Sequence, residues 1–311
     1  MKKRSLLGLA AIGGAAILLR RVRLREDLEW HDVVKPGSVA TIDGYPVHYV
    51  DQGAGPAILL IHGFGGQTFS FRKIIPALTA DHRVIAVDLK GYGYSARDAT
   101  QDLSHTAQVR MLDALLQRLG IDRTVVVGHS MGGAVAMRFA TTHPEKTAAL
   151  VLLASASGEE RHGRRMPPLP PALLRPLLPY LAGIAATRLL EASFYDHANL
   201  TDEVREEYLR PAHIKGSMDG LLKMMRDAAN DAPFDHARIT MPVLLLNGAH
   251  DRVVPLSTAI AVRERIPHAR LVVIERAAHL PMEDQPDETV RAIRDFLAEA
   301  VGSTRAAAPS S

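Results

Sequence analysis

The sequence predicts an α/β fold: a mostly parallel, doubly wound sheet with helices on both faces and a helical cap inserted late in the chain. Short apolar runs, such as residues 57–61 and 243–246, have the length and character of strands that are buried on both faces. Stretches with helical periodicity separate these runs, which indicates parallel strands joined by crossover helices. Residues 157–231 contain no confident strand pattern and are therefore expected to form the cap.

The predicted core comprises residues 39–156 and 232–300. A turn cluster at residues 43–46 predicts a hairpin between its first two strands, and Gly120 is expected to end a helix. Strands are expected at residues 39–42, 47–50, 57–61, 83–88, 125–127, 149–153, 243–246 and 271–274. Helices are expected at residues 71–78, 108–119, after residue 130, and at 181–194, 201–208, 218–229, 257–265 and 289–300. Residues 26–38 are expected to be a linker and residues 301–311 a flexible tail.

Composition and charge exclude several kinds of site. The chain of 311 residues has no cysteine, so disulfides, thiolate catalysis and cysteine-ligated metals are excluded. Seven of its 37 Lys and Arg residues and none of its 34 Asp and Glu residues lie in residues 1–25, so the rest has a net charge of −4. A mildly acidic body argues against nucleic-acid binding. No metal or cofactor is predicted, and the oligomeric state is left open.

Residues 1–25 predict membrane association through a single N-terminal anchor. Lys2, Lys3 and Arg4 precede an uncharged run at residues 5–19, and a second basic cluster begins at Arg20. The run is shorter than the roughly 20 apolar residues of a spanning helix, but the flanking arginines can snorkel to the interface. A helix lying on an anionic leaflet is another interpretation. A cleaved signal segment, which would export the protein to a periplasm, is a third.

The sequence Gly128-His129-Ser130-Met131-Gly132-Gly133 joins a β-branched run to a helical pattern. A strand, a tight turn and a helix form the setting in which a serine becomes a nucleophile. Such a turn strains the serine backbone and leaves almost no room for neighbouring side chains, a demand that Gly128 and Gly132 meet. The stretch therefore predicts Ser130 as the nucleophile, although a plain glycine-rich turn with an inert serine is the competing interpretation.

A serine nucleophile needs a base, and the base needs an acid that orients it. Two strands after the cap end in suitable residues: Asp251 follows the run at 243–246, and His279 follows the run at 271–274. The order Ser130, Asp251, His279 is the one expected for this arrangement. An aspartate that only caps a turn is the alternative for Asp251, and a surface-loop histidine is the alternative for His279.

The reaction also requires two donors for an oxyanion and a surface for the substrate. The backbone N–H groups of Met131 and Phe64 are predicted as the donors, and His62 is expected to brace the loop that carries Phe64. Apolar residues of the cap would suit an acyl chain. The substrate-binding residues predicted in this way are Phe64, His129, Leu174, Leu177, Leu222 and Met225.

Taken together, these motifs resemble the α/β-hydrolase family over residues 39–300. The matching stretches are His62-Gly63-Phe64-Gly65-Gly66, the serine turn, Gly248-Ala249-His250-Asp251, and His279. The basic and apolar N-terminus beside this core is similar to the membrane-anchored monoacylglycerol-lipase-like and bacterial lipase branch of that family. The resemblance implies a serine hydrolase that cleaves carboxylic esters, with lipid-like esters as substrates.

Two alternatives to a lipid esterase stay open at this point. C–C bond hydrolases that act on diketone-type substrates share the same three residues. Some receptors of this fold also keep them while binding a small ligand without significant turnover. A serine-directed covalent probe separates a reactive serine from an inert one, and a panel of esters separates the two enzyme classes.

Overall fold

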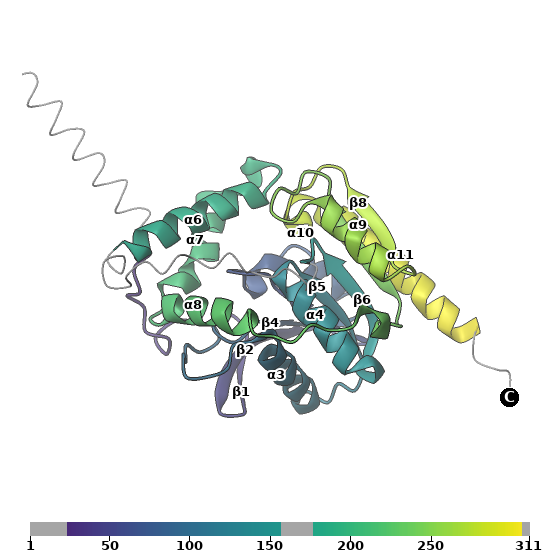
Figure 1. Cartoon of the computed structure of the whole chain (residues 1–311), viewed down its shortest axis with the longest axis horizontal. Helices are drawn as coiled ribbons and strands as arrows, with labels where there is room; N and C mark the ends of the chain where they lie inside the picture. The colour runs from purple at the N-terminus through teal and green to yellow at the C-terminus, as the bar shows by residue number, and fades with distance from the viewer. Residues whose placement is uncertain (1–23, 157–176, 307–311) are drawn as a thin grey trace, which may run out of the picture.

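An eight-stranded sheet forms the centre of the molecule, in the order β1-β2-β4-β3-β5-β6-β7-β8 (Figure 1). The computed structural model describes residues 24–156 and 177–306, with only the backbone for residues 301–306. The strands are β1 (Ser38–Ile42), β2 (Tyr45–Gln52), β3 (Ala57–Ile61), β4 (Arg83–Val87), β5 (Thr124–His129), β6 (Thr147–Leu153), β7 (Val243–Gly248) and β8 (Arg270–Ile274). Strand β2 is antiparallel to both of its neighbours, β1 and β4, whereas the strands from β4 through β3, β5, β6 and β7 to β8 pair with one another in parallel. The predicted mostly parallel sheet is confirmed.

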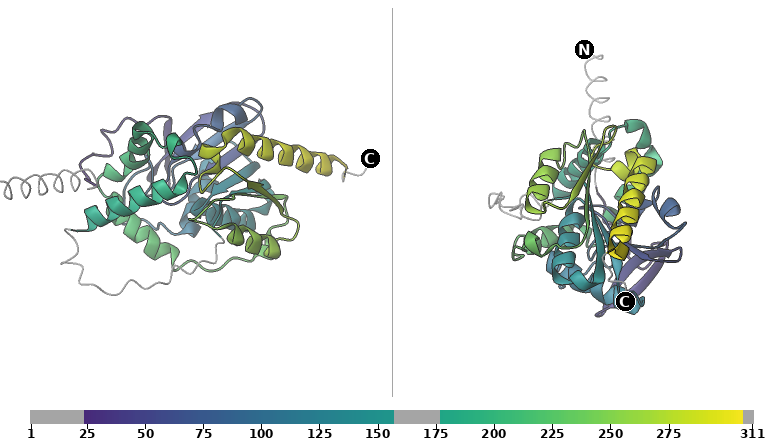
Figure 2. Two further views of the ribbon diagram at one scale, coloured as in Figure 1. Left: turned by 90° about the horizontal axis from the view of Figure 1, so that it is seen from above. Right: turned by 90° about the vertical axis from the view of Figure 1, so that its right-hand side faces the viewer.

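Helices connect the strands and cover the sheet on both faces, as the right-hand view of Figure 2 shows. The α-helices are α2 (Ile75–Leu78), α3 (His105–Arg118), α4 (Met131–Thr142), α6 (Leu178–Ser193), α7 (Asp202–Leu209), α8 (Ser217–Ala228), α9 (Leu256–Arg265), α10 (Pro281–Asp284) and α11 (Pro286–Ala306). Short 3-10 turns are η1 (Thr68–Phe71), η2 (Pro144–Lys146), η3 (His197–Asn199), η4 (Arg210–His213) and η5 (His236–Arg238). The doubly wound arrangement expected from the alternation of elements is confirmed.

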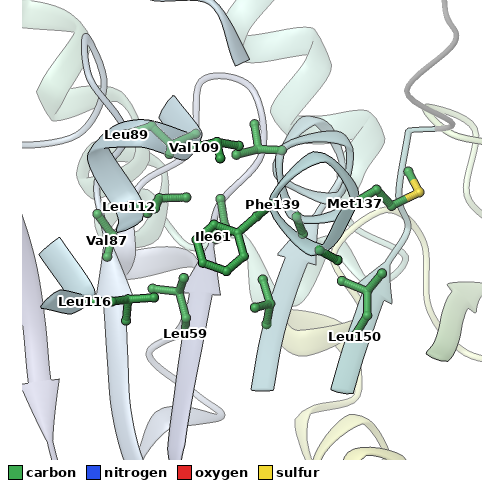
Figure 3. Close-up of a cluster of buried hydrophobic side chains, with 14 of the residues drawn as sticks. Leu59, Ile61, Val87, Leu89, Val109, Leu112, Leu116, Met137, Phe139 and Leu150 are labelled. Carbon is green, nitrogen blue, oxygen red and sulfur yellow. The ribbon is translucent and has the colours of Figure 1, made fainter. Parts of the chain in front are cut away.

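Strand β3 shows why a strand that is covered on both faces consists of apolar residues at every position. Its side chains alternate between the two faces of the sheet. Leu59 and Ile61 belong to an apolar cluster with residues of α3 and α4, part of which is drawn in Figure 3. Ile58 and Leu60 belong to a second cluster with residues of α2 and α11. All four side chains are fully buried, so every position of the run contributes to a core.

The described part of the cap, residues 177–231, contains α6, α7 and α8, with η3 and η4 between them. The chain just before β1 is attached to this cap, so it is more than a linker. Leu28 forms a single parallel bridge with Ile214, and the backbone N–H of Leu24 donates to the carbonyl of Pro179 over 3.2 Å. The first part of the segment predicted as a linker, residues 26–38, thus contacts the cap.

Two element boundaries also differ from the predictions. The helix expected at residues 71–78 is divided into η1 and the short α2, with Pro76 close to the start of α2. The tail expected from residue 301 is helical up to Ala306, because α11 continues through Gly302. One glycine inside a helix costs only about 1 kcal/mol relative to alanine, so it does not by itself end the helix.

Within residues 24–156 and 177–306, no helix is both long enough and apolar enough to cross a bilayer. The predicted N-terminal anchor lies almost entirely in residues 1–23, outside the described residues. Leu174, one of the predicted substrate contacts, also lies outside them.

Candidate active site

Ser130 sits in a tight turn between β5 and α4, with φ 53° and ψ −122°. This is a left-handed conformation that costs a non-glycine residue on the order of 1–3 kcal/mol and persists only where the surroundings enforce it. The surroundings are close. A Cβ atom on Gly128 would lie 2.4 Å from the carbonyl oxygen of Gly132, and one on Gly132 would lie 2.4 Å from that of Ile61. Both positions thus require glycine, as the sequence indicated.

The structure brings the three predicted residues of the triad together. Strands β7 and β8 are parallel neighbours, so the loops that carry Asp251 and His279 meet at one edge of the sheet. The Nε2 atom of His279 lies 3.0 Å from the Oγ atom of Ser130, and its Nδ1 atom lies 2.8 Å from Oδ2 of Asp251. All three residues are buried. A continuous hydrogen-bonded chain therefore runs from the carboxylate to the serine hydroxyl.

Asp251 is held in place by its own loop. Its Oδ1 atom accepts hydrogen bonds from the backbone N–H groups of Val253 and Val254, each over 2.8 Å. This leaves Oδ2 to accept from the His279 ring, which fixes the proton on Nδ1 and leaves Nε2 free to accept the serine proton. The side chain thus combines a turn-forming hydrogen bond with an orienting one.

The loop after β3 lies directly against the serine. A Cβ atom on Gly63 would be 2.8 Å from the Cβ atom of Ser130. His62 braces this loop as expected, because its Nδ1 atom donates to the Gly63 carbonyl over 2.7 Å and its Nε2 atom accepts from the Leu89 N–H over 3.0 Å. Within the described chain, the backbone N–H groups of Phe64 and Met131 donate to no other group. Both are therefore available as donors beside the serine.

His129 connects the serine turn to the histidine loop. Its Nε2 atom donates to the carbonyl oxygen of His279 over 2.8 Å, and the two rings lie 4.8 Å apart. Burial, followed by the nearby His279, holds the pKa of His129 well below its ordinary value of 6.5, so the ring is neutral. His129 lines the cavity described below, but this hydrogen bond also makes it a support for the base.

Glu283 and Asp284 in α10 link the His279 loop to the cap. Asp284 accepts hydrogen bonds from the backbone N–H of Ala278 over 2.9 Å and from that of Tyr195 over 2.9 Å. Glu283 accepts from the hydroxyl of Tyr208 over 2.8 Å and is paired with Arg72. Burial raises the pKa of both carboxyl groups. These two buried carboxyl groups tie cap residues to the loop that carries His279.

Two buried neutral histidines predict a loss of stability in mild acid. Burial lowers the pKa of His62 and of His129, so in the native state both bind a proton only at lower pH than in the unfolded chain. Below about pH 6.5 the unfolded state therefore binds more protons than the native state. Each unit by which the pH is lowered should then decrease the free energy of unfolding by up to about 1.4 kcal/mol per histidine. Urea unfolding between pH 7.5 and pH 5.5 measures this slope.

The variant His129→Gln keeps a side-chain N–H donor but cannot titrate, so its slope should be shallower than that of the wild type. His31→Gln, at an exposed position, should leave the slope unchanged. Equal slopes for His129→Gln and the wild type would contradict the assignment of His129 as a neutral buried group.

A cavity of about 450 Å³ opens above Ser130 and His279, between the core and the cap. This volume suits a small organic ligand. Phe64 and His129 line it, as predicted. On the cap side, its lining residues are mostly small or apolar. They include Ala182, Ala185, Ala186, Leu189, Leu190, Leu209 and Leu221, and the N-terminal segment adds Leu24.

The predicted cap contacts Leu177, Leu222 and Met225 do not line this cavity. Leu177 and Met225 are 52% and 40% exposed. In α8 the inward positions are Leu221 and Met224, three residues apart on one face. A shift of one position rotates a side chain by about 100° around the helix. The apolar composition of the cap therefore predicts the character of the cavity wall, whereas it does not identify which side chains face the cavity.

Arg97 is a cavity-lining residue that sequence reasoning missed, and it is the only Lys or Arg among the described lining residues. Its guanidinium donates to the side chain of Ser217 over 2.8 Å. Its other acceptors are backbone carbonyls: those of Tyr92, Gly93, Ser95 and Pro211. An arginine has five N–H donors, and all five are used here. Burial lowers the pKa of Arg97 to about 10, so it stays charged near neutral pH.

Among residues 24–156 and 177–306, no three His, Asp or Glu side chains are grouped so that they could hold a metal ion. The arrangement that the structure does provide is a serine hydroxyl, a base, an orienting carboxylate and two backbone donors. Such a set can perform nucleophilic attack and general acid–base catalysis.

Comparisons with known proteins place the chain among hydrolases. A family model described as alpha/beta hydrolase fold matches residues 56–286. The chain is 27% identical to the uncharacterized hydrolase YugF of Bacillus subtilis (strain 168) in an alignment of 278 residues, and the match covers 86% of this chain and 99% of the relative. It is 31% identical to 2-hydroxymuconate semialdehyde hydrolase of Pseudomonas putida in an alignment of 272 residues, and the match covers 83% of this chain and 92% of that protein.

Among solved structures, the chain is similar to a probable hydrolytic enzyme from Pseudomonas aeruginosa PAO1. The two share 27% sequence identity with a TM-score of 0.72, and the match covers 88% of this chain and 98% of the other. Because these matches span nearly the whole of each relative, they apply to the core and the cap together.

Proposed function

The chain belongs to the alpha/beta-hydrolase family and is a hydrolase, and we propose that it is a serine hydrolase that cleaves esters of uncharged, apolar acyl chains. The hydrogen-bonded chain from Asp251 through His279 to Ser130 carries the first part of this proposal. The second part is supported by the apolar cavity walls and by Arg97, whose five N–H donors are all used in hydrogen bonds within the protein.

In the proposed reaction, Ser130 Oγ attacks the acyl carbon of the ester while His279 Nε2 takes the hydroxyl proton. The carbonyl oxygen becomes an oxyanion, and the N–H groups of Met131 and Phe64 stabilise it. His279 then gives its proton to the departing alkoxide, which leaves as the alcohol. Asp251 stabilises the charged imidazole between these two transfers.

Water completes the cycle along the same path. His279 takes a proton from the water as the water oxygen attacks the acyl-enzyme. The second oxyanion then accepts hydrogen bonds from the same two backbone N–H groups. When this intermediate collapses, the Ser130 oxygen recovers the proton from His279 and the carboxylic acid is released. The enzyme returns to its starting state with one ester bond hydrolysed.

The lining of the cavity favours an acyl chain without charge. A substrate carboxylate placed in an apolar cavity needs a cationic partner, because an unpaired buried charge is costly. The one cationic side chain of the described lining, Arg97, has no free N–H to offer. A neutral acyl chain needs no such partner, so the cavity favours esters of neutral apolar acids.

The lipid-like part of the proposal depends on the N-terminal sequence. Residues 1–25 combine an apolar run with seven basic residues and no acid, which favours attachment to an anionic membrane. An enzyme held there would meet esters that partition into lipid, such as monoacylglycerols. On this basis we propose that the protein is attached to a membrane and resembles the membrane-anchored monoacylglycerol lipases.

A second candidate function is hydrolysis of a C–C bond in a diketone-type substrate. The similarity to 2-hydroxymuconate semialdehyde hydrolase favours it, and the same serine, histidine and aspartate would serve. Against it, a muconate-derived substrate carries a carboxylate, for which Arg97 provides no free donor.

Ester panels distinguish the two candidates. We expect hydrolysis of p-nitrophenyl esters with a maximum at medium or long acyl chains. A matched ester whose acyl chain ends in a carboxylate should have kcat/KM lower by about tenfold or more, the cost of leaving a charge poorly paired. Preference for the carboxylate ester, or turnover of 2-hydroxymuconate semialdehyde alone, would favour the C–C hydrolase. No serine-dependent turnover of any substrate would favour a ligand-binding protein.

A further inference from the structure

Helix α6 carries a row of apolar side chains that the rest of the described chain leaves exposed. Leu177 at its N-cap, Leu181, Ala185 and Leu189 follow one another at a spacing of four residues, which places them along one side of the helix. Leu177 and Leu181 are each 52% exposed and Leu189 is 37% exposed. Apolar side chains aligned in this way indicate a surface that meets another apolar medium. We call these four residues the α6 stripe.

The α6 stripe leads to the entrance of the catalytic cavity. Ala185 and Leu189 are exposed and also line the cavity. Helix α6 forms the outer edge of the cap in the view of Figure 1. A substrate that approached along the α6 stripe would therefore arrive at the opening above Ser130.

The N-terminal segment joins the body at the same place. Leu24 bonds through its backbone to Pro179 at the start of α6, and its side chain lines the cavity. The 23 residues before it hold an apolar run with basic clusters on both sides. An exposed arginine, Arg188, lies on α6 next to Leu189. Basic groups beside an apolar surface suit anionic lipid headgroups above acyl chains.

We infer that the α6 stripe lies on the surface of an anionic bilayer, so that the catalytic cavity opens directly at the lipid. This inference rests on the proposed ester hydrolase for the substrate that would enter, but its binding surface stands independently of catalysis. A second copy of the chain is a poorer occupant, because a few half-exposed side chains are far less than the roughly 800 Å² per partner of a standard interface.

Fluorescent labels at single cysteines test where the protein touches lipid. The chain has no cysteine of its own, so Leu181→Cys and Ile260→Cys each accept one environment-sensitive dye. Ile260 is a matched control, since it is also exposed, at 39%, but projects from α9 in the core. Vesicles of phosphatidylcholine and phosphatidylglycerol, with or without a nitroxide-bearing lipid, are added to each full-length labelled protein.

The dye at position 181 should shift to bluer emission when vesicles are added and should be quenched by the nitroxide lipid, whereas the dye at position 260 should do neither. Binding of the full chain alone is not the readout, because residues 1–23 would hold it at the vesicle in either case. The inference is overturned if position 181 is not quenched. It is also overturned if that dye is already in an apolar environment without vesicles, since residues 1–23 or a second copy would then cover the α6 stripe.

A double variant tests the delivery of substrate. Leu177→Gln with Leu181→Gln should leave hydrolysis of a soluble short ester unchanged, because neither residue lines the cavity. Hydrolysis of a long-chain ester held in vesicles should fall about tenfold, as expected for two lost apolar contacts with lipid. Equal activity of wild type and variant on the vesicle ester would contradict delivery along α6. Absence of ester turnover in the wild type would contradict the proposed function, while the labels still decide the surface.

Discussion

Replacing Ser130 with alanine is expected to lower kcat for ester hydrolysis by about a million-fold, the scale on which a serine nucleophile contributes to its triad. The physical reason is that His279 then has no hydroxyl to deprotonate and no acyl-enzyme can form. Binding of the substrate should change little, because the cavity walls are intact. Release of p-nitrophenol from a medium-chain ester, followed at saturating substrate, measures the loss.

Another serine of the same cavity provides the control. Ser193 lines the cavity in α6, and its hydroxyl donates to the Leu189 carbonyl over 2.7 Å rather than contacting His279. Ser193→Ala should therefore keep turnover within a few-fold of the wild type. A fluorophosphonate probe should label the wild type and Ser193→Ala but not Ser130→Ala. Labelling that persists in Ser130→Ala would show that the reactive serine lies elsewhere.

The sheet could be predicted because its strands are buried on both faces. A run such as 57–61 contains no polar residue, and a strand between two helical layers requires this at every position. The ends of the helices were harder to predict. Helix α2 is shorter than its apolar pattern suggested, and α11 passes through Gly302. Pro76 suits the first turn of α2, where its missing N–H costs no helical hydrogen bond. A single glycine costs a helix only about 1 kcal/mol, so Gly302 does not end α11.

The central residues of the site could be predicted because their positions follow from topology. Parallel strands place their carboxyl ends at one edge, so Ser130, Asp251 and His279 meet there although up to 149 positions separate them in sequence. The walls of the cavity do not follow from such a rule. Leu222 was expected where Leu221 is found, a difference of one position in helical phase.

Arg97 and Leu24 show a second reason why part of the site was missed. The acceptors of Arg97 come from its own loop and from Pro211 and Ser217 in the cap. Leu24 reaches the cavity because the segment after it bonds to the cap. Both roles arise from contacts between segments distant in sequence, for which no short motif exists. The three residues of the proposed triad were thus easier to recognise in the sequence than the residues that line the cavity.

Replacing Asp251 with asparagine is expected to lower kcat about 10⁴-fold while leaving the fold intact. The asparagine oxygen would keep the two hydrogen bonds from Val253 and Val254, which turns the amide NH₂ toward His279 Nδ1. The Nδ1 atom must then accept a hydrogen bond, so the ring proton moves to Nε2 and the base can no longer take the proton of Ser130. Single-turnover acylation by a p-nitrophenyl ester, with the free energy of unfolding measured in parallel, separates catalysis from stability.

Asp235 provides a control of the same local geometry, because its Oδ1 atom accepts from the backbone N–H two residues later over 2.9 Å, as that of Asp251 does over 2.8 Å. Asparagine preserves such a turn, so Asp235→Asn should be as active as the wild type. If Asp251→Asn were equally active, Asp251 would be a turn residue only, and the acid of the triad would have to be sought elsewhere. In the expected case, Ser130→Ala combined with Asp251→Asn loses no more activity than Ser130→Ala alone, because the aspartate acts only through the histidine that serves the serine.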